Sequence, residues 1–226
     1  MRFGILGTGV VAKTIAVRLD GLGHDVIVGT RNPEETLSRT DPDQYGNPPF
    51  GAWQEEYPEV RLGTFAEAAA HGDMVVNATA GAVSLEALEQ AGEDTLNGKI
   101  LIDISNPLDF SKGMPPTLLV SNTDSLGEQI QRRFPEAKVV KTLHTMNAYL
   151  MVDPAQLAAT DHTVFVSGDD AEAKARVSEL LQSFGWSDII DLGDITTARG
   201  TEMVLPIWVR LFGVLQKPIY NFKIVR

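Results

Sequence analysis

The chain of 226 residues contains no cysteine, which excludes disulfide bonds, thiolate catalysis and cysteine-ligated metal centres. Its four histidines are scattered without the paired spacing of metal ligands, so we expect no metal site. No apolar run reaches the roughly 18 residues that a membrane helix needs, and no basic stretch precedes a hydrophobic segment near the N-terminus. We therefore expect no membrane span and no signal peptide, and a cytoplasmic protein.

Positive charge is also scarce, because 19 basic residues face 30 acidic ones and give a formal net charge of −11. Such a chain repels nucleic acid and anionic membranes, so we expect neither as a partner. An anionic ligand must be held by local donors for the same reason. Hydrophobic residues make up 43% of the chain, which is enough to bury the core of one domain or of one domain with a small appendage.

Short apolar runs alternate with helix-forming stretches, and the runs lack the polar alternation of a half-exposed sheet. Strands are expected at residues 2–6, 25–29, 60–62, 74–77, 100–104, 139–143, 162–167 and 189–191. Helices are expected at residues 10–19, 33–37, 65–71, 84–91, 126–134, 171–184 and 196–215. This order predicts a doubly wound, Rossmann-type α/β fold with a mostly parallel sheet and a small C-terminal helical part. We expect a dinucleotide-binding domain over 1–150 and an α/β extension over 151–226.

The first expected strand ends in a glycine turn, which reads Gly-Thr-Gly-Val-Val-Ala over residues 7–12. In such turns the first glycine permits the tight bend, the second admits a pyrophosphate, and the small third residue lets the helix pack on the strand. The N–H groups and dipole of the helix then face the phosphates. A plain structural turn is the alternative. The dinucleotide interpretation assigns the pyrophosphate to Gly7, Thr8, Gly9, Val10 and Val11.

The second expected strand is followed by Thr30 and Arg31, where an NAD site usually has a carboxylate for the ribose hydroxyls. A carboxylate would repel a 2′-phosphate, whereas a hydroxyl and a guanidinium bind it through charge-assisted hydrogen bonds. We therefore predict NADP(H) as the cofactor. The alternative is that Arg31 is solvated and Thr30 merely caps the next helix.

Three more strands end in residues suited to a ligand, which binds beyond the carboxyl ends of strands in open α/β sheets. Ala78 and Thr79 allow close approach of a nicotinamide riboside, or form only a tight turn. Asn106 either orients the carboxamide or a substrate, or holds the Asn-Pro turn. His144 is a candidate proton donor or relay, although a lone histidine is more often structural. Asn106 and His144 are therefore the candidate catalytic residues.

Two segments interrupt the alternation. Residues 39–59 form a long, aromatic-rich connection, which is either a lid or cofactor wall or a surface loop with its own small cluster. The expected helix 196–215 is apolar on nearly every side, so we expect it to be buried in a homodimer interface. Pro206 is expected to kink this helix, and Arg199 and Glu202, one turn apart, are expected to form an ion pair.

The stretches GILGTGVVAKTIAVRL, VGTRNP, DISNPLDF and KTLHTMNAYL together resemble the NADP oxidoreductases that depend on the deazaflavin coenzyme F420. The resemblance implies hydride transfer between NADPH and the deazaflavin in a cleft between the Rossmann domain and a small C-terminal part. It places His144 near the deazaflavin and Thr30 and Arg31 at the 2′-phosphate. The segment 39–59 departs from the family pattern, and the sequence shows no dense basic cluster suited to the polyanionic deazaflavin tail, for which Lys112 and Lys141 are candidates.

The functional hypothesis is hydride transfer between NADP(H) and coenzyme F420 or a similar flavin-like acceptor, with the acceptor as a small-molecule partner. Two alternatives remain open. One is an NADPH-dependent reductase of a small carbonyl or imine, which would need a proton donor beside the nicotinamide. The other is a module that senses NADP(H) without turnover.

Overall fold

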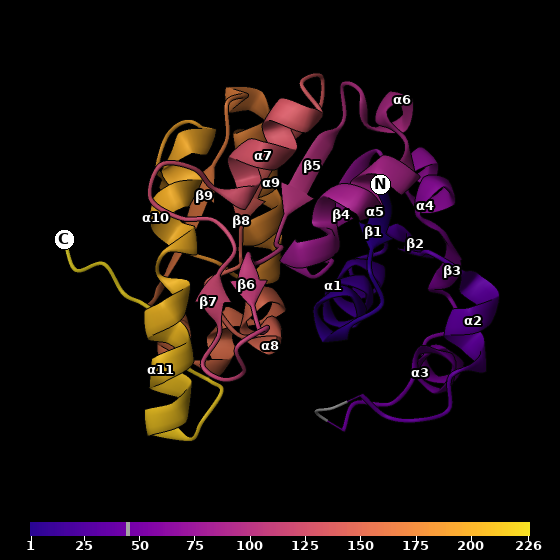
Figure 1. Cartoon of the computed structure of the whole chain (residues 1–226), viewed down its shortest axis with the longest axis horizontal. Helices are drawn as coiled ribbons and strands as arrows, with labels where there is room; N and C mark the ends of the chain where they lie inside the picture. The colour runs from indigo at the N-terminus through magenta and orange to yellow at the C-terminus, as the bar shows by residue number, and fades with distance from the viewer. Residues whose placement is uncertain (44–45) are drawn as a thin grey trace.

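One eight-stranded sheet organises the molecule (Figure 1). The structure is a computed structural model that describes residues 1–43 and 46–226. The strands of this sheet are β1 (Arg2–Leu6), β2 (Asp25–Thr30), β3 (Arg61–Thr64), β4 (Met74–Asn77), β5 (Ile100–Asp103), β8 (Lys138–Thr142), β9 (Thr163–Ser167) and β10 (Asp188–Asp191). Their spatial order is β10-β9-β8-β5-β4-β1-β2-β3. The six strands from β3 to β8 are parallel and follow the strand order of dinucleotide-binding sheets, which confirms the predicted fold class.

The last two strands run in the opposite direction, which the sequence pattern did not reveal. β9 pairs antiparallel to β8, whereas β10 pairs parallel to β9. A parallel strand after β8 would need a crossover that spans the sheet, usually a helix. The connection contains only the short helix α8 (Ala148–Val152) and two 3₁₀ turns, so the chain turns back at the same edge. The segment 151–226 therefore extends the same sheet.

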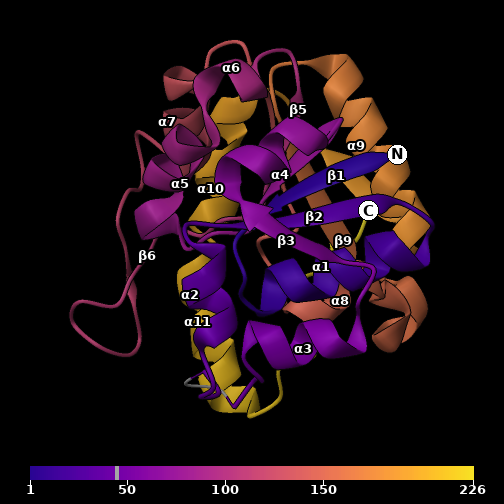
Figure 2. The ribbon, with the colours of Figure 1, turned by 90° about the vertical axis from the view of Figure 1, so that its right-hand side faces the viewer.

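Helices cover both faces of the sheet and create two hydrophobic cores. Figure 2 shows α4, α5, α6 and α7 on one side of the strands and α1, α3 and α8 on the other. The first core contains residues of α1 (Val10–Gly21), α3 (Phe50–Glu56), α8 and α9 (Ala171–Phe184). The second contains residues of α4 (Phe65–His71), α5 (Ser84–Ala91), α6 (Glu93–Leu96), α7 (Leu126–Arg133) and α10 (Ala198–Glu202). The α1 sequence buries Ala12, Ile15, Ala16 and Leu19, the spacing of one helix face.

Local signals explain where several elements begin. Thr64 forms a capping box with Glu67 at α4, and the Ser125 hydroxyl accepts a hydrogen bond from the Glu128 N–H at α7. Asn32 caps α2 (Pro33–Ser38), whose first position is the proline. The short hairpin of β6 (Leu108–Asp109) and β7 (Thr117–Leu118) was not predicted, because two-residue strands carry no periodic signal.

The prediction of a single long C-terminal helix over 196–215 is wrong. The chain forms a 3₁₀ turn, then α10, and then α11 (Leu205–Leu215), with Pro206 in the first turn of α11, where its missing N–H costs nothing. Only Leu205 of α11 is buried, and Ile207 and Val214 are 54% and 78% exposed. In the described part of the chain, no helix combines the length and apolar character needed to cross a membrane.

Candidate functional site

The two glycines of the β1–α1 turn serve different physical purposes. Gly7 has a φ of +112°, and a Cβ atom there would lie 2.8 Å from the carbonyl oxygen of Ala78. Gly9 precedes α1 without a side-chain cap, and a Cβ atom on it would meet nothing within 4 Å. The fold itself therefore requires Gly7, whereas Gly9 leaves open space in front of the first N–H groups of α1. That space and those donors suit an anion.

A cleft of about 350 Å³, here called the α2 cleft, opens beside this turn. It is lined by Thr8, Gly9, Val10, Lys13, Thr36, Arg39, Asp41, Pro42, Asp43, Pro48, Pro49 and Phe50. The predicted Thr30 lies behind it, almost buried, with its hydroxyl 2.9 Å from that of Thr36. Arg31 does not line the α2 cleft, and its mostly exposed guanidinium lies 3.3 Å from the carboxylate of Glu86.

Lys13 is a cation of the α2 cleft that the sequence analysis missed. The side chain is largely buried, and Nζ donates a hydrogen bond to the carbonyl oxygen of Pro48 at 2.6 Å. Nζ also lies 5.9 Å from the ring centre of Trp53. Burial lowers the pKa of Lys13, and the charge of Asp43 partly offsets this. Lys13 follows Val10 by one helical turn, which puts both residues on the face of α1 beside the glycine turn. This spacing is the signal in the sequence that could have identified Lys13.

A second cleft of about 580 Å³, the β5 cleft, lies on the other side of the glycine turn. Its lining comes from four segments, residues 9–11, 78–82, 104–106 and the hairpin residues 108–110 and 119. Ala78, Thr79 and Asn106 are thus brought together with Val10 and Val11, as the sequence analysis predicted for one edge of the sheet. Gly81 lets this segment pack directly on the end of β5, because a Cβ atom on Gly81 would lie 2.1 Å from the backbone carbonyl oxygen of Asn106.

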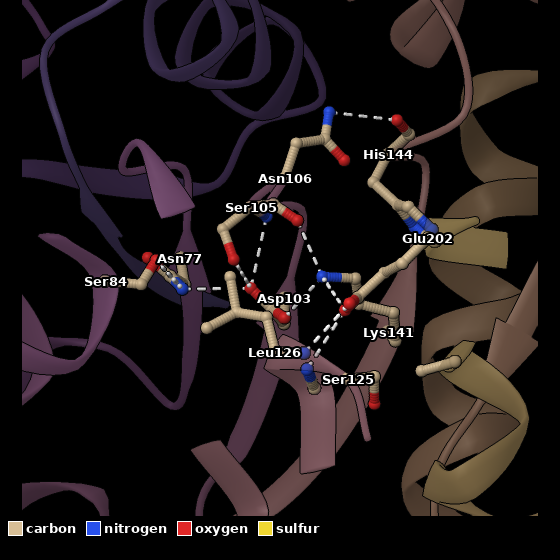
Figure 3. A network of polar contacts seen from close by, with 12 residues as sticks. Asn77, Ser84, Asp103, Ser105, Asn106, Ser125, Leu126, Lys141, His144 and Glu202 are labelled. Atoms are coloured by element: carbon tan, nitrogen blue, oxygen red, sulfur yellow. Dashed lines mark hydrogen bonds and ion pairs between the residues drawn. The ribbon is translucent and has the colours of Figure 1, made fainter. Parts of the chain in front are cut away.

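A buried polar network includes Ser105, which lines the β5 cleft, and residues behind it (Figure 3). Asn77 accepts a hydrogen bond from the Thr79 hydroxyl at 2.7 Å and donates one to Asp103 at 2.9 Å. The Ser105 hydroxyl donates to the same Asp103 oxygen at 2.6 Å. Both hydroxyls that line the cleft are therefore oriented by one buried carboxylate at the end of β5.

Lys141 joins this network from β8 and is fully buried. Its Nζ lies 2.8 Å from Asp103 and 3.0 Å from Glu202, and donates to the Ser105 carbonyl oxygen at 2.6 Å. Burial alone would lower the pKa of Lys141, but the two carboxylates outweigh it and raise the pKa. Lys141 is therefore a structural cation and cannot reach a deazaflavin tail, so that candidate role was wrong, while Lys112 remains exposed.

The expected Arg199–Glu202 ion pair was also wrong. Glu202 pairs with Lys141 and accepts hydrogen bonds from the N–H groups of Leu126 and Gly127 at 2.8 and 3.0 Å. Arg199 instead forms two hydrogen bonds with Glu128. Helical spacing places the two side chains near each other, but buried partners on β8 and α7 compete successfully for them.

Asn106 and His144 lie close together, but through an unexpected contact. Asn106 Nδ2 donates a hydrogen bond to the backbone carbonyl oxygen of His144 at 3.1 Å. Asn106 lines the β5 cleft, whereas His144 does not and is only 2% exposed. Figure 3 shows the imidazole turned away from Asn106, toward Lys141 and Glu202. In the described part of the chain, Asn106 Oδ1 and both imidazole nitrogens are buried without a hydrogen-bond partner.

Comparison with known proteins gives the family. The family model of coenzyme F420-dependent NADP oxidoreductases matches residues 2–107. A crystal structure from Arthrobacter sp. FB24, named as a candidate F420-dependent NADP reductase, is 61% identical, covers 100% of both chains and superposes with a TM-score of 0.95. The chain belongs to the coenzyme F420-dependent NADP oxidoreductase family.

The curated relatives carry two kinds of name. The F420-dependent NADP reductase of Methanocaldococcus jannaschii is 30% identical over 64% of each chain. Metalloreductase STEAP3 of Rattus norvegicus is 30% identical over 92% of this chain. The chain spans only 38% of that metalloreductase. The match therefore concerns one part of a longer relative.

Within this family fold, the segment 39–59 forms both a wall and a cluster. Residues 41–43 and 48–50 line the α2 cleft, while Phe50 and Trp53 are buried with ring centres 4.9 Å apart. Trp53 and Tyr57 also line a third cleft of about 500 Å³ between α1, α3 and α8. Residues 44 and 45 lie outside the described residues. Among the rest, no group of three or more histidine or acidic side chains is placed to hold a metal ion.

Proposed function

We propose that the chain binds NADP(H) across the glycine turn, with the adenosine half in the α2 cleft and the nicotinamide half in the β5 cleft. The residues present fit this cofactor. Gly9 leaves room for a pyrophosphate at an uncapped helix N-terminus, and Asn106 Oδ1 offers a buried acceptor that has no partner in the described residues. Family membership supports the same cofactor.

The α2 cleft contains two basic side chains beside the acidic Asp41 and Asp43, and we propose that the basic pair selects NADP(H) over NAD(H) by binding its 2′-phosphate. Lys13 and Arg39 line this cleft together with Thr36 of α2, whose hydroxyl lies 2.9 Å from that of Thr30 at the end of β2, and Arg31 follows Thr30 in the sequence. In the described part of the chain, Arg39 forms an exposed pair with Glu35 at 2.8 Å, a contact that a 2′-phosphate can replace at little cost. We assign the 2′-phosphate to Arg39 and Lys13 in addition to the predicted Thr30 and Arg31.

In the β5 cleft the chain binds and orients the nicotinamide and the acceptor, and it excludes water from them. The bound nicotinamide supplies the hydride. Ala78 and Thr79 set the depth of the cleft, and the Asp103 network fixes the hydroxyls of Thr79 and Ser105. Fixed positions of this kind lower the barrier by holding the reacting groups close and aligned.

We propose coenzyme F420 or a similar flavin-like molecule as the acceptor. The observation that carries this proposal is the composition of the β5 cleft, whose described lining includes no lysine, tyrosine or histidine. A carbonyl or imine substrate needs a proton donor at the reacting atom, whereas a planar heterocycle with an exposed ring nitrogen receives its proton from water. The apolar hairpin residues Leu108, Phe110 and Leu119 offer such a ring a flat contact.

The test mixes the protein with NADPH and oxidised coenzyme F420 and follows the deazaflavin absorbance. Bleaching that depends on both reactants supports the proposal. Bleaching of FMN or FAD but not of F420 assigns a flavin acceptor, and oxidation of NADPH only by carbonyl or imine compounds overturns the acceptor class. Tight NADPH binding without oxidation by any acceptor identifies a sensing module instead.

We further propose a homodimer that covers α11. Ile207, Phe212 and Val214 are each at least 43% exposed on a helix with almost no charge, an unusual surface for a monomer. If α11 is the interface, the double variant Ile207→Asp and Phe212→Asp should be a monomer in light scattering. An unchanged mass for this variant places the interface elsewhere.

A further inference from the structure

We infer that His144 contributes to nicotinamide recognition through its backbone carbonyl rather than its imidazole. The carbonyl fixes the amide of Asn106 so that Oδ1 remains as the acceptor for the carboxamide N–H₂ group. This inference rests on the proposed binding of NADP(H) and adds a specific residue pair to it.

The backbone at the end of β8 is built to present that carbonyl. Leu143 has a φ of +62°, a conformation that non-glycine residues seldom adopt. The N–H of His144 donates to the Thr142 carbonyl oxygen at 2.8 Å, which closes a tight turn. Strain of this kind persists only where the surroundings fix it, and it clusters at functional sites. The result of the turn is that the His144 carbonyl oxygen meets Asn106 Nδ2.

This contact decides which end of the Asn106 amide is free. A carbonyl oxygen accepts hydrogen bonds only, so it selects the Nδ2 end of the amide. Oδ1 is then left buried beside the β5 cleft, without a partner in the described residues. An unmade hydrogen bond at a buried acceptor is costly, so a ligand that donates there gains the missing contact. A primary carboxamide provides a planar N–H₂ donor of this kind.

The imidazole has no comparable route to the cleft. His144 is 2% exposed, does not line the β5 cleft, and turns toward Lys141 and Glu202 (Figure 3). Burial first, and then the charge of Lys141, hold its pKa well below the usual value, partly offset by the backbone of Thr142 and Thr201. The ring is therefore a neutral packing group, and the role implied for it beside the acceptor passes to Asn106.

Calorimetry with NADP⁺ and its 3-acetylpyridine analogue tests this inference. The analogue carries a methyl ketone in place of the amide and lacks the N–H₂ donor. We expect the wild-type chain to bind NADP⁺ roughly tenfold more tightly than the analogue, the value of one buried hydrogen bond. Asn106→Leu is expected to bind both with equal affinity. His144→Leu and His144→Gln, which keep the carbonyl, are expected to retain the tenfold preference.

The controls separate this inference from the proposed function. Asn97→Leu replaces an exposed asparagine outside the clefts and is expected to behave as the wild type. If the wild type binds neither nucleotide, the proposed function fails. If it binds both equally, or if His144→Gln loses the preference while Asn106→Leu keeps it, only the assignment of Asn106 and the His144 carbonyl is overturned. Circular dichroism checks that each variant is folded.

Discussion

Replacing Lys141 with methionine should destabilise the protein more than any surface substitution of similar size. The variant removes an ammonium group whose hydrogen bonds and ion pairs to Ser105, Asp103 and Glu202 measure 2.6 to 3.0 Å, all within the interior. It leaves two carboxylates buried without their cation. Breaking a buried ion pair from one side costs about 3–5 kcal/mol, several times the value of an exposed pair.

Urea denaturation followed by tryptophan fluorescence measures this change, because Trp186 is buried against the Met151 carbonyl oxygen and reports unfolding. Lys138→Met is the matched control on the same strand, since Lys138 forms only a partly exposed pair with Asp170 at 3.0 Å. We expect the control to lose less than about 1 kcal/mol. Adding Glu202→Gln to Lys141→Met should recover part of the loss. A loss below about 1 kcal/mol for Lys141→Met would refute the interpretation of this cluster as a coupled buried network.

Three further predictions concern ligand binding and pH. Gly9→Ala should weaken NADP⁺ binding at least about tenfold in calorimetry while moving the unfolding midpoint by no more than about 4 °C. Gly7→Ala should lower the unfolding midpoint further. The reverse pattern would contradict the assignment of the two glycines. Arg39→Ala should raise the Kd for NADPH about 10- to 100-fold and that for NADH less than about threefold, with a smaller effect for the solvated Arg31→Ala; equal losses for both nucleotides would remove Arg39 from the 2′-phosphate. The depressed pKa of His144 means that the unfolded chain binds a proton below about pH 6.5, whereas the folded chain does not. The free energy of unfolding is therefore highest above that pH and declines by up to about 1.4 kcal/mol per pH unit as the pH falls. His144→Leu should flatten this slope in urea denaturation across the same range, and an unaltered slope would contradict the assignment.

Much of the fold was predictable because its strands and helices carry local signals. The continuous apolar runs at 2–6 and 74–77 and the helices at 65–71, 84–91 and 171–184 match the observed bounds. Reversal of β9 was not predictable, since an apolar strand reads alike in either direction. The helix α3 was hidden by the prolines and glycines around it, and its burial depends on contacts of Phe50 and Trp53 with α1 and the sheet.

The candidate site was predictable where a strand end determines position. Ala78, Thr79 and Asn106 line one cleft because parallel strands deliver their carboxyl ends to one edge. Tertiary partners decided the rest. Lys141 and Glu202 are far apart in sequence, so their pairing carries no local signal, and the positive φ of Leu143, just before His144, is not a conformation that a leucine predicts. Arg39 was overlooked because it follows α2 by one residue, inside the irregular segment.

The separation of the two cores by the sheet has a consequence for how the site loosens. The wall of the α2 cleft rests on α1 and α3 in the first core, while α7 and α10, which hold Glu202 beneath the β5 cleft, belong to the second. With the dinucleotide bound as proposed, opening of the layer that contains α3 should loosen the adenosine half first, because only α1 of this layer also lines the β5 cleft. Amide hydrogen exchange should accordingly show two protection classes, one on each side of the strands, with the strands themselves slowest.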